Sequence, residues 1–173
     1  ITPPETAELI EAIVRATGAV KVLELGTCTG FTALHILRAI YGKPGARLVT
    51  IDARPAHDEV FFAKYPILQF VEGWTPDILK TLHGETFDLV FIDSDHSVEH
   101  TKIELAALWP LTRARSVFLF HDLPEWQTPA AREAVPIRTF LLNKCKDANW
   151  QGGIVPTCEQ LDCLAAFGAG YPP

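Results

Sequence analysis

An α/β domain with a doubly wound, mostly parallel sheet is the fold that the sequence predicts, on three observations. Short apolar runs typical of buried strands alternate along the chain with segments whose apolar residues recur at helical spacing. Such alternation implies right-handed crossovers and a parallel sheet that is covered on both faces. The length of 173 residues is that of one ordinary domain, and the content of 48% apolar and 21% charged residues is typical of globular proteins. We therefore expect one domain over residues 1–173 with seven strands, the last of them antiparallel.

The individual elements follow from capping residues, apolar spacing and turn residues. The first helix is expected to begin at Thr2 as N-cap, with Pro3 in its first turn and Glu5 closing a capping box, and to end at Gly18. The remaining helices are predicted at 31–41, 55–64, 76–82, 98–109 and 132–144. Strands are predicted at 20–25, 47–51, 67–71, 87–92, 116–120, 152–156 and 161–167. The last two strands are separated by only four residues, which favours an antiparallel hairpin.

Composition and charge exclude several classes of partner. The net charge of −6 gives no electrostatic footprint for nucleic acid or for anionic membrane surfaces. No apolar run approaches the 18 or so residues of a membrane span. Four cysteines are sparse for a chain of this length, so reduced thiols are expected. We expect a cytoplasmic protein, and because the chain has no Met and begins at Ile1, we expect further residues before it.

Polar residues stand at the carboxyl end of every predicted parallel strand. In a doubly wound sheet the ligand lies outside these ends, near the point where the strand order reverses. The residues in question are Glu24 and Gly26 after the first strand, Asp52 after the second, Glu72, Gly73 and Trp74 after the third, Asp93, Ser94, Asp95 and His96 after the fourth, and His121 and Asp122 after the fifth. A binding site is therefore predicted at this edge of the sheet.

A glycine-bearing turn, residues 26–30, joins the first strand to the following helix. Such a turn lets the backbone approach a ligand closely, and a helix N-terminus favours negative charge. Asp52 follows Gly26 by 26 residues, a spacing that suits a carboxylate bonded to ribose hydroxyls. The dinucleotide pattern G-x-G-x-x-G would need glycine where Cys28 and Phe31 stand. The sequence thus favours a cofactor with one nucleoside over a nicotinamide or flavin dinucleotide.

Four segments in order resemble the class I S-adenosylmethionine-dependent methyltransferases. VLELGTCTG (22–30) looks like the first motif of that class, VTID (49–52) like the second, FDLVFID (87–93) like the fourth strand, and the closing hairpin like the antiparallel seventh strand. FIDSDH (91–96) with FHD (120–122) is most similar to small O-methyltransferases related to catechol O-methyltransferase and to cephalosporin-hydroxylase-like proteins. The resemblance implies a Rossmann-like seven-stranded sheet, S-adenosylmethionine as cofactor and a small hydroxylated acceptor.

The resemblance also implies a role for each residue of the site. Glu24 and the turn, including Gly26, Thr27, Cys28 and Gly30, would hold the methionine part of the cofactor. Asp52 would bind the ribose, and Gly73 with Trp74 would flank the adenine. Simple core packing is the alternative for Trp74, since tryptophan is usually largely buried.

A divalent cation is the second group that the resemblance implies, held by Asp93, which also borders the cofactor, and by His121 and Asp122. The catechol enzyme has Asp then Asn where this chain has His121-Asp122. Oxygen ligands favour Mg²⁺, a histidine ligand shifts the preference toward Mn²⁺, Fe²⁺ or Zn²⁺, and alternatively His121 only supports the ligands.

His96 falls where the catechol enzyme has its catalytic lysine, so Asp93 and His96 are the candidate catalytic residues. Alternatively His96 caps the helix that starts near Ser97. Residues 123–136 are the candidate acceptor-side loop, with Trp126 as the residue to test there, and a plain surface connection is the alternative. The sequence leaves the oligomeric state open, and a homodimer through a sheet edge or the N-terminal helix is one arrangement that it allows.

Two rival functions follow from other features. His96-Ser97-Val98-Glu99-His100 matches the H-x-x-E-H pattern of zinc peptidases, with His96 and His100 on one helical face. The more favoured interpretation places Glu99 and His100 on a solvated helix face. The other rival is a non-catalytic S-adenosylmethionine-binding or interaction domain, because a fold does not fix a function.

Overall fold

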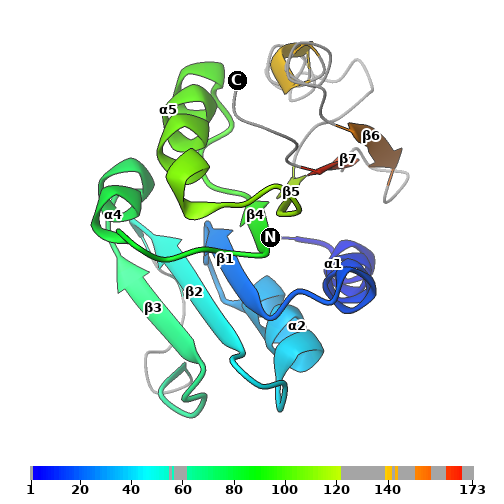
Figure 1. Ribbon diagram of the computed structural model, residues 1–173, viewed down its shortest axis with the longest axis vertical. Coiled ribbons are helices and arrows are strands. Elements are labelled where there is room, and N and C mark those ends of the chain that lie inside the picture. Colours follow the sequence, from blue (N-terminus) through cyan, green and yellow to red (C-terminus); the bar gives the residue numbers. More distant parts are fainter. Residues whose placement is uncertain are drawn as a thin grey trace.

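The structure is a computed structural model that describes residues 2–54, 56, 62–121, 139–141, 143, 151–156 and 163–168 (Figure 1). Its centre is one sheet with the strand order β3-β2-β1-β4-β5-β7-β6. The strands are β1 Lys21–Leu25, β2 Arg47–Asp52, β3 Leu68–Glu72, β4 Leu89–Ile92, β5 Val117–Phe120, β6 Gln151–Pro156 and β7 Cys163–Gly168.

The first five strands run parallel, which confirms the predicted α/β class with a parallel sheet. β7 pairs with β5 in the antiparallel sense, and β6 pairs with β7 in the same sense. The strand order reverses at β1, whose two neighbours are β2 and β4. The carboxyl ends of β1 and β4 therefore form the switch point at which such sheets bind ligands.

Helices cover the sheet on both faces, as side-chain alternation along the strands requires. The described helices are α1 Pro4–Thr17, α2 Phe31–Ile40, α4 Thr75–Thr81 and α5 Val98–Leu108, followed by the 3₁₀ turn η1 Trp109–Leu111. α1 and α2 pack on strand residues such as Val22 and Phe91, whereas α4 and α5 pack on Leu23 and Val90 of the opposite face. No helix of the described part is long and apolar enough to cross a membrane.

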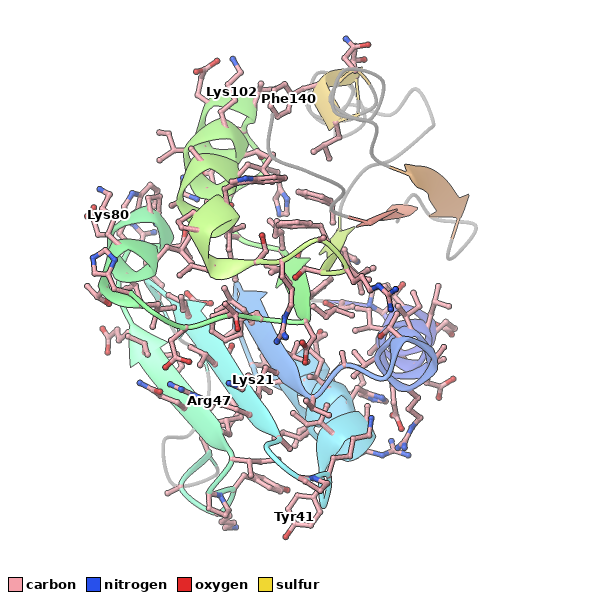
Figure 2. The ribbon with its side chains drawn as sticks, in the orientation of Figure 1. Lys21, Tyr41, Arg47, Lys80, Lys102 and Phe140 are labelled. Carbon is pink, nitrogen blue, oxygen red and sulfur yellow. The ribbon has the colours of Figure 1, made fainter. Side chains whose placement is uncertain are left out.

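The described residues 139–141 lie in a helical turn against α5. Leu141 is buried in the same core cluster as α5, and the ammonium of Lys102 stands 5.8 Å from the centre of the Phe140 ring (Figure 2). The predicted helices at 55–64 and 132–144 fall mostly outside the described residues.

The start of α1 differs from the prediction. Pro3 is the N-cap residue with extended backbone, α1 begins at Pro4, and no side chain caps it. Two successive prolines place the first helical residue one step later than the capping box requires, so Thr2 stands outside the helix. The predicted capping box of Thr2 and Glu5 is therefore wrong, and Thr2 is free to reach the edge of the sheet.

Candidate functional site

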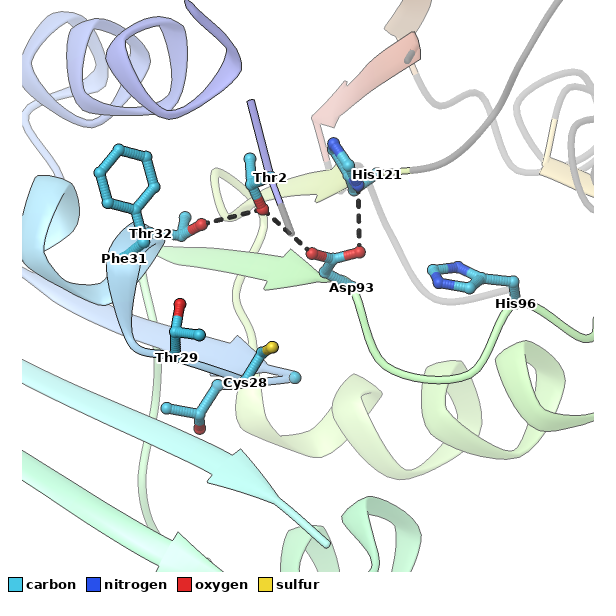
Figure 3. Close-up of a pocket in the computed structure, with 10 residues that line it drawn as sticks. Thr2, Cys28, Thr29, Phe31, Thr32, Asp93, His96 and His121 are labelled. Carbon is cyan, nitrogen blue, oxygen red and sulfur yellow. Dashed lines mark hydrogen bonds and ion pairs between the residues drawn. The ribbon is translucent and has the colours of Figure 1, made fainter. Parts of the chain in front are cut away.

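Two cavities open at the carboxyl ends of the central strands. The larger cavity, about 530 Å³, is lined among others by Asp52, Arg54, Trp74, Thr75, Ser94 and His100. The smaller cavity, about 370 Å³, is lined among others by Thr2, Thr29, Phe31, Thr32, His96 and His121 (Figure 3). Both cavities are also lined by Gly26, Cys28 and Asp93. Two ligand groups bound in these cavities would thus meet across one thin wall.

Gly26 makes that wall possible. Its φ is +96°, and a Cβ placed on it would lie 2.1 Å from the backbone oxygen of Asp93. No side chain can occupy that space, so only glycine allows the turn after β1 to touch the loop after β4. Gly30, at φ +79°, ends the turn as N-cap of α2 and lies against the Phe62 ring. The two glycines of the turn therefore have two separate steric causes.

Asp52 fixes the same turn from the end of β2. Its Oδ2 accepts a hydrogen bond from the backbone N–H of Cys28 at 2.7 Å, and its Oδ1 accepts one from the N–H of Arg54 at 2.7 Å. Cys28 needs this support because it is the one described non-glycine residue with positive φ, +47°. Each carboxylate oxygen keeps acceptor capacity for a ligand in the larger cavity.

Glu24 lies fully buried under the turn, at the end of β1. Its Oε2 accepts a hydrogen bond from Thr50 Oγ1 at 2.5 Å, and Thr50 Oγ1 is 2.6 Å from Thr27 Oγ1. Its Oε1 has no hydrogen-bond partner among the described residues. Burial raises the pKa of the Glu24 carboxyl to about 8, the Thr50 hydrogen bond works against the rise, and the charges of Asp93 and Asp52 add to it. Glu24 is thus an acid whose second oxygen is still unsatisfied.

Asp93 is hydrogen-bonded through both carboxylate oxygens (Figure 3). Thr2 Oγ1 donates to Oδ2 at 3.2 Å, and His121 Nδ1 lies 3.1 Å from Oδ1. Thr32 Oγ1 in turn donates to Thr2 Oγ1 at 3.1 Å. A carboxylate only accepts, so Nδ1 of His121 carries the proton in this pair. The pairing of Asp93 with His121 agrees with their predicted proximity.

The third predicted metal ligand, Asp122, lies outside the described residues, as do Trp126 and the rest of the predicted acceptor-side loop. Within the part of the chain that is described, no group of three His, Cys, Asp or Glu side chains is arranged to hold a metal ion. The predicted cation site therefore stays a prediction.

His96 lies exposed on the loop between β4 and α5 and lines the smaller cavity (Figure 3). The N-cap of α5 is Ser97, whose hydroxyl accepts from the N–H of His100 at 3.3 Å. Asp95 Oδ1 accepts from the Ser97 N–H at 2.8 Å, and hydrogen bonding by Ser97 lowers the pKa of the Asp95 carboxyl. The alternative in which His96 itself caps the helix is therefore wrong, because Ser97 is the N-cap residue.

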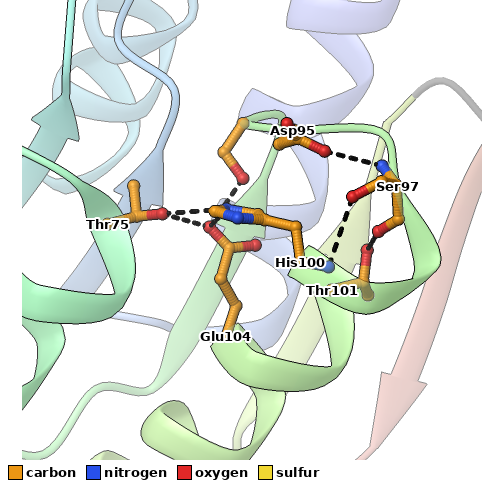
Figure 4. Close-up of polar contacts among 7 residues, drawn as sticks. Thr75, Asp95, Ser97, His100, Thr101 and Glu104 are labelled. Atoms are coloured by element: carbon orange, nitrogen blue, oxygen red, sulfur yellow. Dashed lines mark hydrogen bonds and ion pairs between the residues drawn. The ribbon is translucent and has the colours of Figure 1, made fainter.

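His100 is buried rather than solvated, which corrects one prediction (Figure 4). Its Nε2 lies 2.8 Å from Glu104 Oε1 and 3.1 Å from Thr75 Oγ1. Thr75 Oγ1 donates to the same Glu104 oxygen, and Ser94 Oγ donates to it at 2.7 Å. The group of Thr75, Ser94, His100 and Glu104, called here the Glu104 cluster, joins three elements at the wall of the larger cavity. Glu99, in contrast, is exposed as expected and pairs with Lys102.

The zinc-peptidase alternative does not fit this geometry. His96 precedes the helix and His100 is one turn inside it, so the two imidazoles do not share a helical face. The ring of His100 is already engaged by Glu104 and Thr75. The two histidines therefore do not form the predicted zinc pair.

Trp74 lies at the rim of the larger cavity, half-exposed at 51%. Its ring meets the His100 ring edge to face, with centroids 4.6 Å apart. Core packing is thus excluded as the reason for this tryptophan. Gly73 precedes it with φ +153°, and a Cβ there would meet the Ile78 side chain at 2.8 Å.

Replacing His100 by alanine is expected to destabilise the fold by about 2–3 kcal/mol. The variant removes a donor from the fully buried Glu104 carboxyl and leaves that group less satisfied. Urea unfolding would measure the loss, with Glu99→Ala on the exposed face of the same helix as control. Equal stability of the two variants would contradict a structural role for the His100 hydrogen bond.

The sequence alone did not single out Thr2, Thr50, Thr75 or Glu104 as part of the site. Ser94 is predicted only from its position after the fourth strand, whereas Thr27 is predicted as part of the turn that holds the methionine part of the cofactor. One signal was available for Glu104: an acid four residues after His100 shares its helical face. The spacing of the threonines in the sequence predicts no such contact, because each of them reaches the site from a different element.

Comparison with known proteins adds evidence that the geometry does not contain. A family model described as "Methyltransferase domain" matches residues 23–123. Catechol O-methyltransferase B of Danio rerio is 36% identical over 109 residues, which is 55% of this chain and 40% of that protein. Catechol O-methyltransferase of Mycobacterium tuberculosis is 38% identical over 86 residues, 46% of this chain and 38% of that protein. The chain thus matches about two fifths of the length of these curated relatives.

A solved structure has the same fold over nearly the whole chain. The O-methyltransferase from Bacillus cereus in complex with SAH superposes with a TM-score of 0.72 at 18% identity, covering 98% of this chain and 83% of that one. The family model covers more than half of the chain and spans both the glycine turn and the end of β5. The chain therefore belongs to the methyltransferase domain family.

Proposed function

We propose that this chain transfers the methyl group of S-adenosylmethionine to an oxygen of a small hydroxylated acceptor. The observation that carries the proposal is the pair of cavities divided by Gly26, Cys28 and Asp93. A cofactor bound across this wall would place its nucleoside in the larger cavity and its methyl group toward the smaller one. The O-methyltransferase relatives, of which the Bacillus cereus structure holds SAH, support the same choice of cofactor and reaction.

The residues around the larger cavity fit a nucleoside. Asp52 presents a carboxylate that has acceptor capacity for ribose hydroxyls, and Trp74 offers a half-exposed aromatic ring to a base. Gly26 lines both cavities without a side chain that would occupy them. Thr27 and Cys28 of the turn line the smaller cavity. The Oε1 atom of Glu24, which has no hydrogen-bond partner among the described residues, lies beneath the turn and suits a cationic methionine group bound above it.

The chemical step needs an acceptor oxygen in line with the methyl group and a place for the acceptor proton. When bound, S-adenosylmethionine would supply an electrophilic methyl group, with its thioether as the leaving group. His96 is our candidate for the base, because its imidazole lines the smaller cavity and has a ring nitrogen that can take up a proton. Asp93, held by Thr2 and His121, would orient the acceptor hydroxyl.

Assistance by a divalent cation, Mg²⁺ or Mn²⁺, forms a separate part of the proposal. Asp93 lines the smaller cavity and supplies the oxygen donors these ions prefer, with His121 beside it and Asp122 next in sequence. Such an ion would lower the pKa of the acceptor hydroxyl. Metal addition should then increase turnover of the intact chain, and Asp93→Asn should abolish that increase. Turnover that is the same with chelator and with metal would remove the cation from the reaction.

Replacing Asp52 by alanine is expected to weaken cofactor binding by about 1.5–3 kcal/mol, which is roughly 10- to 150-fold in Kd. The variant loses the carboxylate proposed for the ribose and the hydrogen bond that fixes Cys28. Calorimetric titration with S-adenosylhomocysteine measures the change. Asp77→Ala, which removes an exposed carboxylate from α4, is the control and should bind like the wild type. Unchanged affinity of Asp52→Ala would refute the ribose assignment.

Calorimetric titration with S-adenosylmethionine and S-adenosylhomocysteine, with and without Mg²⁺ or Mn²⁺, is the direct test of the proposed function. Micromolar binding, followed by methyl transfer in a screen of small hydroxylated acceptors, would support it. Binding without turnover of any acceptor would favour the non-catalytic cofactor-binding domain. No binding of either compound would refute both functions.

The remaining expectations concern the setting of the reaction. We propose that residues 1–173 act as a single methyltransferase domain, that the protein is cytoplasmic, and that its partner besides the cofactor is a small molecule rather than nucleic acid or a membrane. A homodimer is also proposed. Sedimentation of the purified chain tests the oligomeric state.

A further inference from the structure

Glu24 is a buried acid that has no basic partner among the described residues. Its side chain is fully buried, and its described contact is the hydroxyl of Thr50 on the neighbouring strand β2. Oε1 has no hydrogen-bond partner there. A buried carboxylate without a cation is strongly disfavoured, because its charge is removed from water and nothing replaces the lost solvation.

The charged groups that face Glu24 from the neighbouring strands are acids as well. Asp52 ends β2 on one side of β1, and Asp93 follows β4 on the other side. Both carboxylate charges raise the pKa of Glu24, and they add to the larger effect of burial. Three carboxyl groups thus surround the turn at residues 26–28, and the innermost is the one that gives up its charge most easily.

A cofactor bound over the turn would change this balance. S-adenosylmethionine carries a sulfonium and an ammonium group, and its methionine part is proposed to lie on Gly26 and Thr27. These residues directly follow Glu24 and Leu25 in the chain, and both line the smaller cavity. A positive charge at this place favours the ionised form of a nearby acid.

We propose that Glu24 is protonated in the free protein and releases its proton when the cationic cofactor binds. The inference rests on the proposed function, because it needs S-adenosylmethionine in this site. Glu24 is then negatively charged only when the cationic cofactor is bound. The free protein therefore holds no buried unpaired charge at this position. The proton leaves the carboxyl oxygen for solvent, and no other bond changes.

A route for that proton is visible in the hydrogen bonds. Glu24 Oε2, Thr50 Oγ1 and Thr27 Oγ1 follow one another at 2.5 Å and 2.6 Å. Hydroxyl groups both donate and accept, so a proton on Oε2 would be donated to Thr50 Oγ1, opposite to the hydrogen bond that the carboxylate receives, and would pass on by exchange of hydrogen bonds. Thr27 lines the smaller cavity, where the chain ends at solvent.

The test is calorimetric titration of the whole chain with S-adenosylmethionine in two buffers of different ionisation enthalpy, with chelator present. The difference in heat counts the protons released. Near pH 7 we expect release approaching one proton per cofactor, and an affinity that rises up to tenfold per pH unit until about pH 8. The Glu24→Gln variant keeps an acceptor for Thr50 and should bind with no such release and no such pH dependence.

The site holds other ionisable groups, and the variants separate their contribution from that of Glu24. The amino group of the cofactor and the imidazoles of His96, His100 and His121 are present equally in wild type and in Glu24→Gln, so the difference between the two belongs to Glu24. Glu99→Gln, on the exposed face of α5, should release protons like the wild type. Equal release by wild type and Glu24→Gln would overturn the inference.

Infrared difference spectroscopy on the wild type needs no substitution and covers the case in which Glu24→Gln does not fold. Cofactor addition should remove the carbonyl band of a protonated carboxylic acid, and an unchanged band would overturn the inference. Binding without proton release would leave the proposed function intact and refute only the role of Glu24. No binding at any pH would refute both.

Discussion

The Glu24→Gln variant is expected to be more stable than the wild type in alkaline solution, and its stability should depend less on pH. Burial raises the pKa of Glu24 from 4.5 to about 8 in the folded chain. Because the folded pKa is the higher one, the folded state binds the proton more tightly than the unfolded state. Stability from this group is therefore complete below pH 4.5 and is lost as the pH rises through 8. The shift corresponds to ~5 kcal/mol over that window.

Urea unfolding at pH values between 6 and 9 measures this effect. The free energy of unfolding of the wild type should fall over the range, and that of Glu24→Gln should fall much less. Glu99→Gln is the matched control, because it removes an exposed carboxyl group from α5 and should follow the wild type. If wild type and Glu24→Gln lose stability in parallel, the pH dependence belongs to other groups and Glu24 is ionised in the free chain.

The Gly26→Ala variant is expected to lose about 4 kcal/mol of stability or more, together with cofactor binding. The added methyl group would lie 2.1 Å from the carbonyl oxygen of Asp93 and 2.6 Å from its carbonyl carbon, and the residue would keep φ near +96°. Backbone atoms cannot rotate away as a side chain does, so β1 and β4 must separate at the switch point. The wall shared by the two cavities would then be broken.

Gly84→Ala is the control for backbone conformation alone. Gly84 has a similar positive φ of +81°, but nothing lies within 4 Å of its added Cβ. That variant should cost only the ~1–2 kcal/mol of a left-handed alanine. Thermal unfolding and titration with S-adenosylhomocysteine compare the two. Similar losses in both variants would show that the contact with Asp93 is unimportant.

The sheet and the edge that bears the site could be predicted because both depend on local patterns. Apolar runs predict the parallel strands, and the residues that end them, such as Glu24, Asp52 and Asp93, meet at the switch point by topology alone. The position of His96 after the fourth strand likewise predicts that it lies at this edge, and it lines the smaller cavity. The resemblance to known methyltransferases agrees with the family match over residues 23–123.

The failures concern contacts between distant elements. His100 reads as a surface residue of α5, but Thr75 and Glu104 bury it by pairing with its ring. Thr2 reads as a helix cap, but two prolines shift the helix and let its hydroxyl reach Asp93, 91 residues away. No periodicity in the sequence encodes such partners, because each depends on where the complete sheet places the next loop.

The Glu104 cluster has a consequence for how the protein opens. One carboxylate oxygen receives donors from the start of α4, from the loop after β4 and from α5 (Figure 4). None of these segments can separate from the others without leaving a buried acceptor unsatisfied. They therefore form one cooperative unit, whose amides should exchange with deuterium at a common rate. A ligand that touches only Trp74 would slow exchange along the first turns of both helices.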